Sequence, residues 1–323
     1  MKILILHPGG LGDIILSLPA VALVRKRHPS ASITMAGNID HLAPVGRPYI
    51  DRVVALATLP LHRLHSAGDL PEEDVQFWKS YDRIISWTGW GNSTFVHQLK
   101  RLHPHACIAS WHPGAGEQRH VAQIFIDSLG PEFQGASGLQ PVILKVDRVA
   151  DADAARWLIG QGWRSTERLI ALHPGAGSEV KRWPLSRFVD LALRLNATAG
   201  NAKLLIIEGP AEAGISAAVL QALPYGAAIA VPSVSLRLLA GLIARCEIFV
   251  GNDSGIAHLA AALNIPSVVL FGPTLPQHWA PLGGHVKILR DSSGCQACSS
   301  GKGEHTCLLN ISVGKVLEAM RNS

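Results

Sequence analysis

The sequence predicts an α/β protein made of two doubly wound domains. Apolar runs of strand length alternate with segments of helical period, which is typical of a parallel sheet with helices on both faces. The alternation starts afresh near residue 150, so the second half repeats the first in kind. The 323 residues also match the length of two ordinary domains. We place the domains at 1–150 and 151–323.

The elements expected in the first half follow in chain order. A helical segment with an apolar period, 16–29, ends at His28-Pro29, and a second helix, 121–130, is closed by Gly130. The strands expected here are short apolar runs, at 2–7, 31–37, 51–56 and 81–87.

The second half opens with an extended segment, 141–146, and a helix over 151–162 that Asp151 is expected to cap. Further apolar runs separated by helical segments predict strands at 168–175, 202–209, 227–231, 246–251 and 266–272.

Composition and charge narrow the class of protein. Hydrophobic residues make up 48% of the chain and mean hydropathy is +0.22, which excludes a disordered protein. No apolar run approaches the ~20 residues of a membrane span. The first ten residues have too short an apolar segment for a signal peptide, so a cytosolic protein is expected. The 29 Lys and Arg against 24 Asp and Glu are dispersed, so nucleic acid is not expected. An acidic ligand, an anionic membrane surface or an ordinary solvated surface would each suit the charge.

Four loops that follow predicted strands are unusually rich in Gly, Ser, Thr and Pro. Ligands of doubly wound sheets bind beyond the carboxyl ends of the strands, where such loops run into helices. The loops therefore predict a binding site rather than scattered turns. They are HPGGLGD (7–13), HPGAGSEVK (173–181), GNDSGIAH (251–258) and FGPTLPQHW (271–279).

The loop at 251–258 carries the most chemistry. Asn252 or Asp253 is expected to cap the helix that follows, and Ser254 and Gly255 then lie where backbone N–H groups can bind an anion. His258, about one turn further on, can donate to the same anion. The alternative is an ordinary capped helix with His258 packed against the sheet. A lysine in another strand-end loop, Lys181, favours a phosphate site.

The chain resembles glycosyltransferase family 9, the bacterial heptosyltransferases of the lipopolysaccharide inner core. The similarity lies in ILILHPGGLGDIILSLPA, HPGAGSEVKRWP, EGPAE, FVGNDSGIAHLAAALNIPSVVLFGPT and CQACSSGKGEHTCLLNIS. It implies a GT-B fold, two Rossmann-like domains facing across a cleft, with the acceptor on the N-terminal domain and the nucleotide-sugar donor on the C-terminal one. It also implies inverting transfer of a heptose or related sugar from an ADP-sugar to a lipopolysaccharide core or other glycan. No cofactor or metal would be required, and the enzyme would be cytoplasmic, in peripheral contact with the inner membrane.

The resemblance assigns two catalytic roles. Asp13 matches the base that deprotonates the acceptor hydroxyl, although a carboxylate at this place can also serve only as a helix N-terminal acid. Lys181 matches the lysine that contacts the donor diphosphate and neutralises the leaving ADP. The neighbouring Trp183 and Pro184 are expected to shape the loop and start the helix.

The remaining donor-site residues are carried over from the same motifs. Glu212 matches the acid that binds the ribose hydroxyls, with Glu208 as a rival, and Val234 falls where the family lines the adenine. The diphosphate and sugar contacts, and the loop residues expected beside them, are Gly12, Gly177, Ser178, Asp253, Ser254, Gly255, His258 and Thr274. On the acceptor side the sequence singles out Trp87, Trp90, His97, His103, His105 and His112, most of which packing or surface loops would explain.

Three cysteines near the C-terminus, Cys295, Cys298 and Cys307, are weak candidates for a metal site. C-x-x-C spacing supplies half of a site, but a closed tetrahedral site needs four ligands. His305 is the only nearby fourth ligand and, two residues before Cys307, is expected to be badly aimed. No metal is therefore expected.

Two other functions remain open. A nicotinamide-dependent oxidoreductase is disfavoured because the loop at 7–13 lacks the G-x-G-x-x-G pattern. A catalytically inactive, glycan-binding member of the same family is disfavoured because Asp13, Lys181 and Asp253 are all present.

Overall fold

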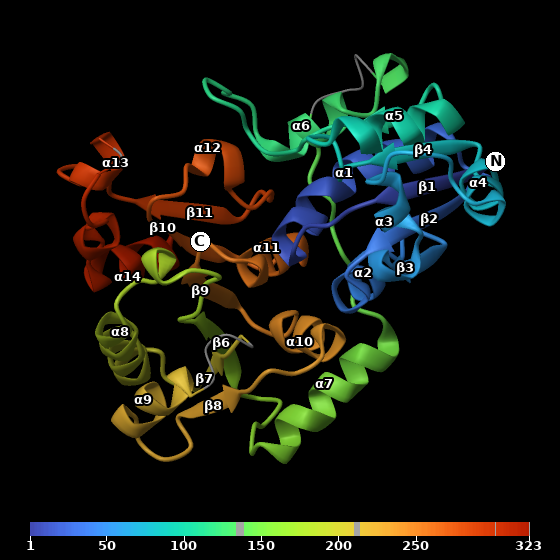
Figure 1. Cartoon of the computed structure of the whole chain (residues 1–323). Coiled ribbons are helices and arrows are strands. Elements are labelled where there is room, and N and C mark those ends of the chain that lie inside the picture. The colour runs from blue at the N-terminus through green and yellow to red at the C-terminus, as the bar shows by residue number, and fades with distance from the viewer. Residues whose placement is uncertain (134–138, 210–213, 301, 323) are drawn as a thin grey trace. The chain divides into compact units, whose positions relative to one another are not determined.

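The computed structural model describes residues 1–133, 139–209, 214–300 and 302–322 and divides the chain into two compact units, Met1–Val142 and Ile143–Ser323. Each unit is a parallel sheet with helices on both faces (Figure 1), so the α/β prediction is confirmed. The boundary placed near residue 150 falls about eight residues further along, inside helix α7 (Arg148–Gly160). Among the described residues, no helix is both long and apolar enough to cross a membrane.

The first sheet has strand order β3-β2-β1-β4-β5 with all strands parallel. Its central strand alternates its side chains, so that Leu4 and Leu6 enter a core with Trp78 and Phe95. The four predicted strands are confirmed, whereas β5 was not predicted because two residues give no apolar pattern. The bounds are β1 (Lys2–Leu6), β2 (Ser32–Gly37), β3 (Arg52–Ala55), β4 (Arg83–Ser86) and β5 (Cys107–Ile108).

The helices of the first unit cover the two faces of this sheet. Helix α1 packs against α6 on one face, and α3, α4 and α5 contribute to the core on the other. As predicted, α1 ends beside His28, and Gly130 follows α6 with a φ of +107° that favours glycine. The bounds are α1 (Leu11–Arg27), α2 (Ile39–Val45), η1 (Leu56–Thr58), α3 (Leu61–Leu64), α4 (Glu72–Lys79), α5 (Ser93–Leu102), α6 (Val121–Asp127) and η2 (Pro131–Phe133).

The second sheet has strand order β11-β10-β9-β6-β7-β8, again all parallel. The chain moves outward from β6 through β7 to β8, then returns to β9 and moves the other way, so the topological switch point lies between β6 and β9. The five predicted strands are confirmed, and β11 is additional. The bounds are β6 (Arg168–His173), β7 (Ala202–Ile207), β8 (Ala228–Val231), β9 (Ile248–Asn252), β10 (Ser267–Phe271) and β11 (Val286–Arg290).

The segment 141–146, expected to be extended, joins no sheet. The expected cap of the helix that follows is wrong. The cap of α7 is Asp147 rather than Asp151, because the Asp147 carboxylate accepts hydrogen bonds from the N–H groups of Val149 and Ala150. Asp151 lies within the first turn of the helix.

Helices α8, α9 and α14 cover one face of the second sheet, where Trp183 and Phe188 lie in the main core. Helices α7, α10 and α11 pack together apart from that core, and a Cβ on Gly241 of α10 would lie 2.7 Å from the Ala150 carbonyl oxygen of α7. The bounds are η3 (Glu179–Lys181), α8 (Leu185–Thr198), α9 (Ile215–Ala222), α10 (Leu236–Ile243), α11 (Gly255–Ala262), α12 (Pro276–Trp279), α13 (Gln296–Ser300), η4 (Cys307–Asn310) and α14 (Val313–Arg321).

Candidate functional site

The switch point of the second sheet brings two predicted site residues into direct contact. Lys181 ends the loop that follows β6, and Asp253 directly follows β9. The Lys181 Nζ lies 2.8 Å from the Asp253 Oδ2, with 32% of the lysine side chain and 5% of the aspartate side chain exposed. A buried carboxylate therefore holds the ammonium group at the place where doubly wound sheets bind ligands.

Asn252, the last residue of β9, holds this loop in place. Its side chain is fully buried, and its Oδ1 accepts a hydrogen bond from the Trp183 N–H at 2.9 Å. Its Nδ2 donates to the carbonyl oxygens of Pro174 at 2.7 Å and Gly175 at 3.2 Å. One amide side chain thus ties both ends of the β6 loop to the end of β9.

The expected cap of α11 is therefore wrong. The cap is Ser254, whose Oγ accepts from the Ala257 N–H at 3.3 Å. Asn252 cannot cap because its side chain is used in the β6 loop, and Asp253 pairs with Lys181. The positioning role of Asn252 was missed, although an asparagine directly after a buried apolar run is a signal that its amide has buried partners.

Two strand-end histidines are uncharged. His173 ends β6 and lies 3.3 Å from the Ser254 Oγ through its Nδ1. Burial lowers the pKa of His173 to about 3. Burial likewise lowers the pKa of His7, which follows β1, to about 3. Near neutral pH these two rings therefore add no positive charge at their strand ends, whereas Lys181 and the N-terminal end of α11 do.

Other predicted donor residues lie at the same carboxyl edge of the second sheet. Gly177 and Ser178 are exposed in the β6 loop, Val234 is half-buried after β8, and Gly255 begins α11. A side chain on Gly177 would meet no atom within 4 Å, so the backbone there is open to a ligand. His258 is 4% exposed on α11, in agreement with packing against the sheet.

Two buried polar atoms at this edge have no hydrogen-bond partner among the described residues. They are the Nε2 of His173 and the Oγ1 of Thr274, which follows β10. Because buried polar atoms in folded proteins are almost always hydrogen-bonded, these two are available to a bound molecule or water.

The structure describes only one of the two acidic residues expected to bind the ribose. Glu208 follows β7, and its Oε1 accepts from the Ser216 N–H at 2.8 Å and the Ser216 Oγ at 2.6 Å. Burial acts to raise the pKa of Glu208, but these hydrogen bonds hold that pKa below its usual value. Glu208 thus already binds the start of α9 through one oxygen. Glu212 lies outside the described residues.

In the first unit, Asp13 lies half-buried in the first turn of α1, directly after Gly12. Its Oδ2 accepts a hydrogen bond from the Gly10 N–H at 2.9 Å, so this carboxylate does cap the helix. The loop is tight, since a Cβ on Gly9 would lie 2.6 Å from the Asp13 Cβ. A carboxylate has about four acceptor positions, so the capping bond leaves capacity for a proton and the role as base stays a prediction.

Packing within the first unit explains some of the tryptophans and histidines that the sequence singles out on the acceptor side. Trp87 is fully buried and makes ring contacts with His7 and Phe125, and His103 lies against the Trp78 carbonyl oxygen at 2.7 Å. Trp90, in contrast, is 50% exposed.

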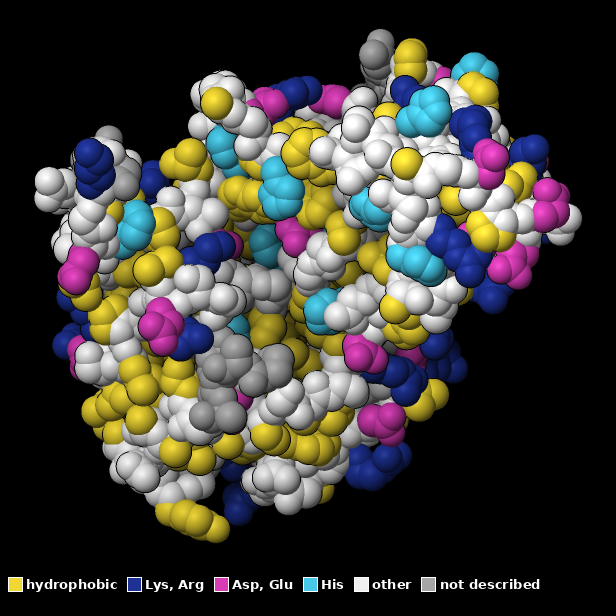
Figure 2. Space-filling model, in the orientation of Figure 1, with side chains coloured by type: hydrophobic (Ala, Val, Ile, Leu, Met, Phe, Trp, Pro, Cys, Tyr) yellow, Lys and Arg dark blue, Asp and Glu magenta, His cyan; other side chains and the backbone are white. Residues whose placement is uncertain are grey.

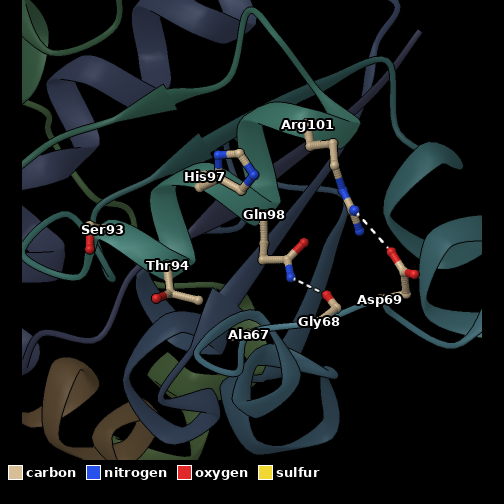
Figure 3. A pocket seen from close by; sticks show the side chains of 8 residues that line it. All are labelled: Ala67, Gly68, Asp69, Ser93, Thr94, His97, Gln98 and Arg101. Atoms are coloured by element: carbon tan, nitrogen blue, oxygen red, sulfur yellow. Dashed lines mark hydrogen bonds and ion pairs between the residues drawn. The ribbon is translucent and has the colours of Figure 1, made fainter.

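A hollow of about 540 Å³ lies beside α5 in the same unit, and His97 is the one acceptor-side candidate among its lining residues. Figure 3 shows Gln98 and Arg101 extending from α5 toward Gly68 and Asp69. The Gln98 Nε2 donates to the Gly68 carbonyl at 2.6 Å, and Arg101 pairs with Asp69 at 3.1 Å. None of the predicted catalytic or donor residues lines this hollow.

The C-terminal cysteines come together with the histidine that was expected to be badly aimed. The ligand atoms of Cys295, Cys298, His305 and Cys307 all lie within 4.8 Å of one another. The expectation about His305 is therefore wrong, because its Nδ1 lies 3.5 Å from the Cys298 Sγ.

Basic side chains do not form one continuous patch on the face drawn in Figure 2, where Lys and Arg are scattered among acidic and apolar groups. This distribution agrees with the formal net charge of only +5.

Comparison with known proteins decides the family. The family model described as glycosyltransferase family 9 (heptosyltransferase) matches residues 138–308, more than half of the chain. The chain belongs to glycosyltransferase family 9. The glycosyltransferase class predicted from the sequence is thereby confirmed, and the nicotinamide-dependent oxidoreductase is wrong.

Several relatives of this glycosyltransferase are similar over nearly their full lengths. Lipopolysaccharide heptosyltransferase 2 of Escherichia coli (strain K12) is 26% identical, with 99% of this chain and 97% of the relative covered. The structure of E. coli ADP-heptose LPS heptosyltransferase II matches with a TM-score of 0.78 at 20% identity, covering 100% of this chain and 98% of the other. A family 9 glycosyl transferase from Veillonella parvula DSM 2008 matches with a TM-score of 0.80 at 22% identity, covering 99% and 96%. The predicted GT-B fold is confirmed by these likenesses.

Proposed function

We propose that this glycosyltransferase transfers a heptose from ADP-heptose to a saccharide of the lipopolysaccharide core, with inversion at the anomeric carbon. The observation that carries the proposal is the ion pair of Lys181 and Asp253 at the switch point of the second sheet, beside the N-terminal end of α11. The substrates are taken from the relatives, which are named as an ADP-heptose LPS heptosyltransferase and a lipopolysaccharide heptosyltransferase.

The second unit is proposed to bind the donor. A diphosphate needs fixed positive charge and N–H donors, and Lys181 with the first turn of α11 offers both. Asp253 acts here as a positioning residue, because its buried carboxylate orients the ammonium group. Thr274 and His173 supply buried polar atoms that lack a partner among the described residues. Glu212, or Glu208 in its place, is proposed for the ribose hydroxyls, and Val234 for the adenine.

In the proposed reaction the acceptor hydroxyl gives its proton to the Asp13 carboxylate. The hydroxyl oxygen forms a bond to the anomeric carbon as the bond from that carbon to the phosphate oxygen breaks. The electron pair leaves with ADP, whose growing negative charge is neutralised by Lys181 and the helix N-terminus. Attack opposite to the leaving group inverts the anomeric centre. No step uses a metal or a cofactor.

The glycolipid acceptor implies work at a membrane surface. We infer a peripheral location at the cytoplasmic face of the inner membrane, where a mildly basic protein is attracted to anionic lipids. Cell fractionation in low and high salt tests this location, since a peripheral protein leaves the membrane fraction as salt rises.

The test of function uses the purified chain. Thermal shift with ADP, GDP, UDP and NAD reads out the nucleotide, because only a bound ligand raises Tm by mass action. ADP-heptose and a core acceptor are then supplied, and mass spectrometry follows the heptosylated product and the ADP released. NMR of the product assigns the anomer. Stabilisation by UDP or GDP but not by ADP would overturn the donor assignment, and a product of retained configuration would overturn inversion.

A further inference from the structure

The segment after β11 gathers three thiols and one imidazole in a small space. Cys295 directly precedes α13, Cys298 lies within it, and Cys307 begins η4. Cys295 and Cys307 are buried, Cys298 is half-buried, and His305 is exposed. The proposed donor and catalytic residues do not include any of the four, so the transferase reaction leaves this cluster unexplained.

The distances within the cluster fit a tetrahedral ion. The Cys298 Sγ lies 3.7 Å from the Cys307 Sγ and 3.5 Å from the His305 Nδ1. A zinc ion with Zn–S bonds of about 2.3 Å and a Zn–N bond of about 2.0 Å holds its ligand atoms about 3.8 Å apart for two sulfurs and about 3.5 Å apart for sulfur and nitrogen. The two measured separations are thus close to the edges of such a tetrahedron.

A disulfide does not account for the arrangement. Bonded sulfurs lie about 2.05 Å apart, and the structure joins none of the five cysteines in this way. Any one disulfide would also leave a third thiol and the imidazole beside it.

Apolar packing is also a weak explanation for the cluster. Its buried core is separate from the main core and consists of Cys295, Ala297 and Cys307, with Cys298 packed against them. So little apolar surface contributes little to folding, whereas a metal bound only by the folded chain can order a segment this small.

The chain that leaves the cluster runs into the core beneath the donor loops. Leu308 packs closely against Gly272, and a Cβ added to Gly272 would lie 3.0 Å from the Leu308 Cδ1. The Ile311 carbonyl accepts hydrogen bonds from the Trp183 Nε1, at 2.9 Å, and from Arg187. An ion in the cluster would therefore anchor residues that support the loop carrying Lys181.

We propose that Cys295, Cys298, His305 and Cys307 bind one thiophilic divalent cation, zinc or ferrous iron, in a closed structural site. Four protein ligands leave no open position for a substrate, so the ion stabilises the second unit and takes no part in transfer. The proposal does not depend on which donor and acceptor the enzyme uses.

Elemental analysis of the full chain tests the proposal. The protein is purified in reductant without a metal-affinity step, and we expect about one equivalent of metal per chain, with the element distinguishing zinc from iron. Cys298→Ser should lose most of it, whereas the matched control Cys107→Ser, in the first unit, should retain it. Metal retained by Cys298→Ser at the wild-type level would contradict the assignment.

Cobalt substitution keeps the test decisive if variants fold poorly. Wild-type protein is stripped with a chelator, checked for folding by circular dichroism and titrated with Co²⁺. We expect intense tetrahedral d–d bands with thiolate-to-cobalt absorption, and a higher Tm on adding zinc. The proposal is overturned by purified wild-type chain that holds no metal and gives no such bands, or by an intact mass showing a disulfide among these cysteines.

Discussion

Replacing Lys181 by Met separates the two roles of this lysine, holding a buried charge and binding the donor. Removing one partner of a fully buried ion pair costs about 3–5 kcal/mol, whereas an exposed pair contributes only about 0.2–1 kcal/mol. Asp253 is 5% exposed and Lys181 is 32% exposed. The pair lies between these limits, so we expect the variant to lose about 1–3 kcal/mol of unfolding free energy.

The same substitution should weaken ADP binding. A hydrogen bond to a charged group contributes about 1.5–3 kcal/mol, which corresponds to roughly 10- to 150-fold in Kd. Calorimetric titration with ADP measures the affinity, and urea denaturation measures the stability. Lys315→Met is the matched control, because Lys315 pairs with Asp291 at 3.2 Å in a more exposed setting. It should cost under about 1 kcal/mol and leave ADP affinity unchanged.

The double variant Lys181→Met with Asp253→Asn completes the test. A neutral amide at position 253 needs no counter-charge, so the double variant should regain most of the lost stability while ADP affinity stays low. Wild-type ADP affinity in Lys181→Met would remove Lys181 from the donor site. A double variant no more stable than the single one would show that the ion pair does not set the cost.

Three further predictions follow from single side chains. Asn252→Ala should lower the free energy of unfolding by about 2–5 kcal/mol, because it leaves three buried backbone groups without partners. Asn201→Ala, at an exposed position, should lower it far less. Equal losses in the two variants would refute the role of Asn252 in holding the β6 loop. Asp13→Asn should keep the helix cap and ADP binding while turnover falls about a hundred- to ten-thousand-fold, and near-normal turnover would exclude the base role. Burial lowers the pKa values of His7 and His173 in the folded state, so the unfolded chain binds more protons. The free energy of unfolding should therefore fall as pH drops from 6.5 toward 3, by about 2 kcal/mol for each ring at pH 5. Denaturation at pH 7 and pH 5 should show a smaller loss in His173→Asn, and an unchanged loss would contradict this assignment.

The strands that the sequence predicts most clearly are those whose residues are buried on both faces. Fully covered parallel strands such as β6 and β10 read as continuous apolar runs bounded by turn residues, and that pattern is local. Two of the four edge strands were missed, whereas β3 and β8 were predicted. β11 is half-buried along its whole length and β5 has two residues, so neither offers a contrast that a sequence pattern can detect.

The sequence also predicts the types of residue at the proposed donor site, since glycines, a lysine and helix-capping side chains follow predicted strands. It does not predict which residues these side chains contact. Three neighbouring residues, Asn252, Asp253 and Ser254, could each have capped α11, and the choice depended on which side chain the β6 loop buries.

Tertiary structure alone decided the pairings between distant residues. Lys181 meets Asp253, 72 positions away, only because β6 and β9 are neighbours in the sheet, and His305 meets Cys298 although α13 ends between them. Local apolar period and turn chemistry determine where an element forms, because they act between residues close in sequence. Which side chains then meet depends on strand order and loop path, and these are set by the packing of the whole unit.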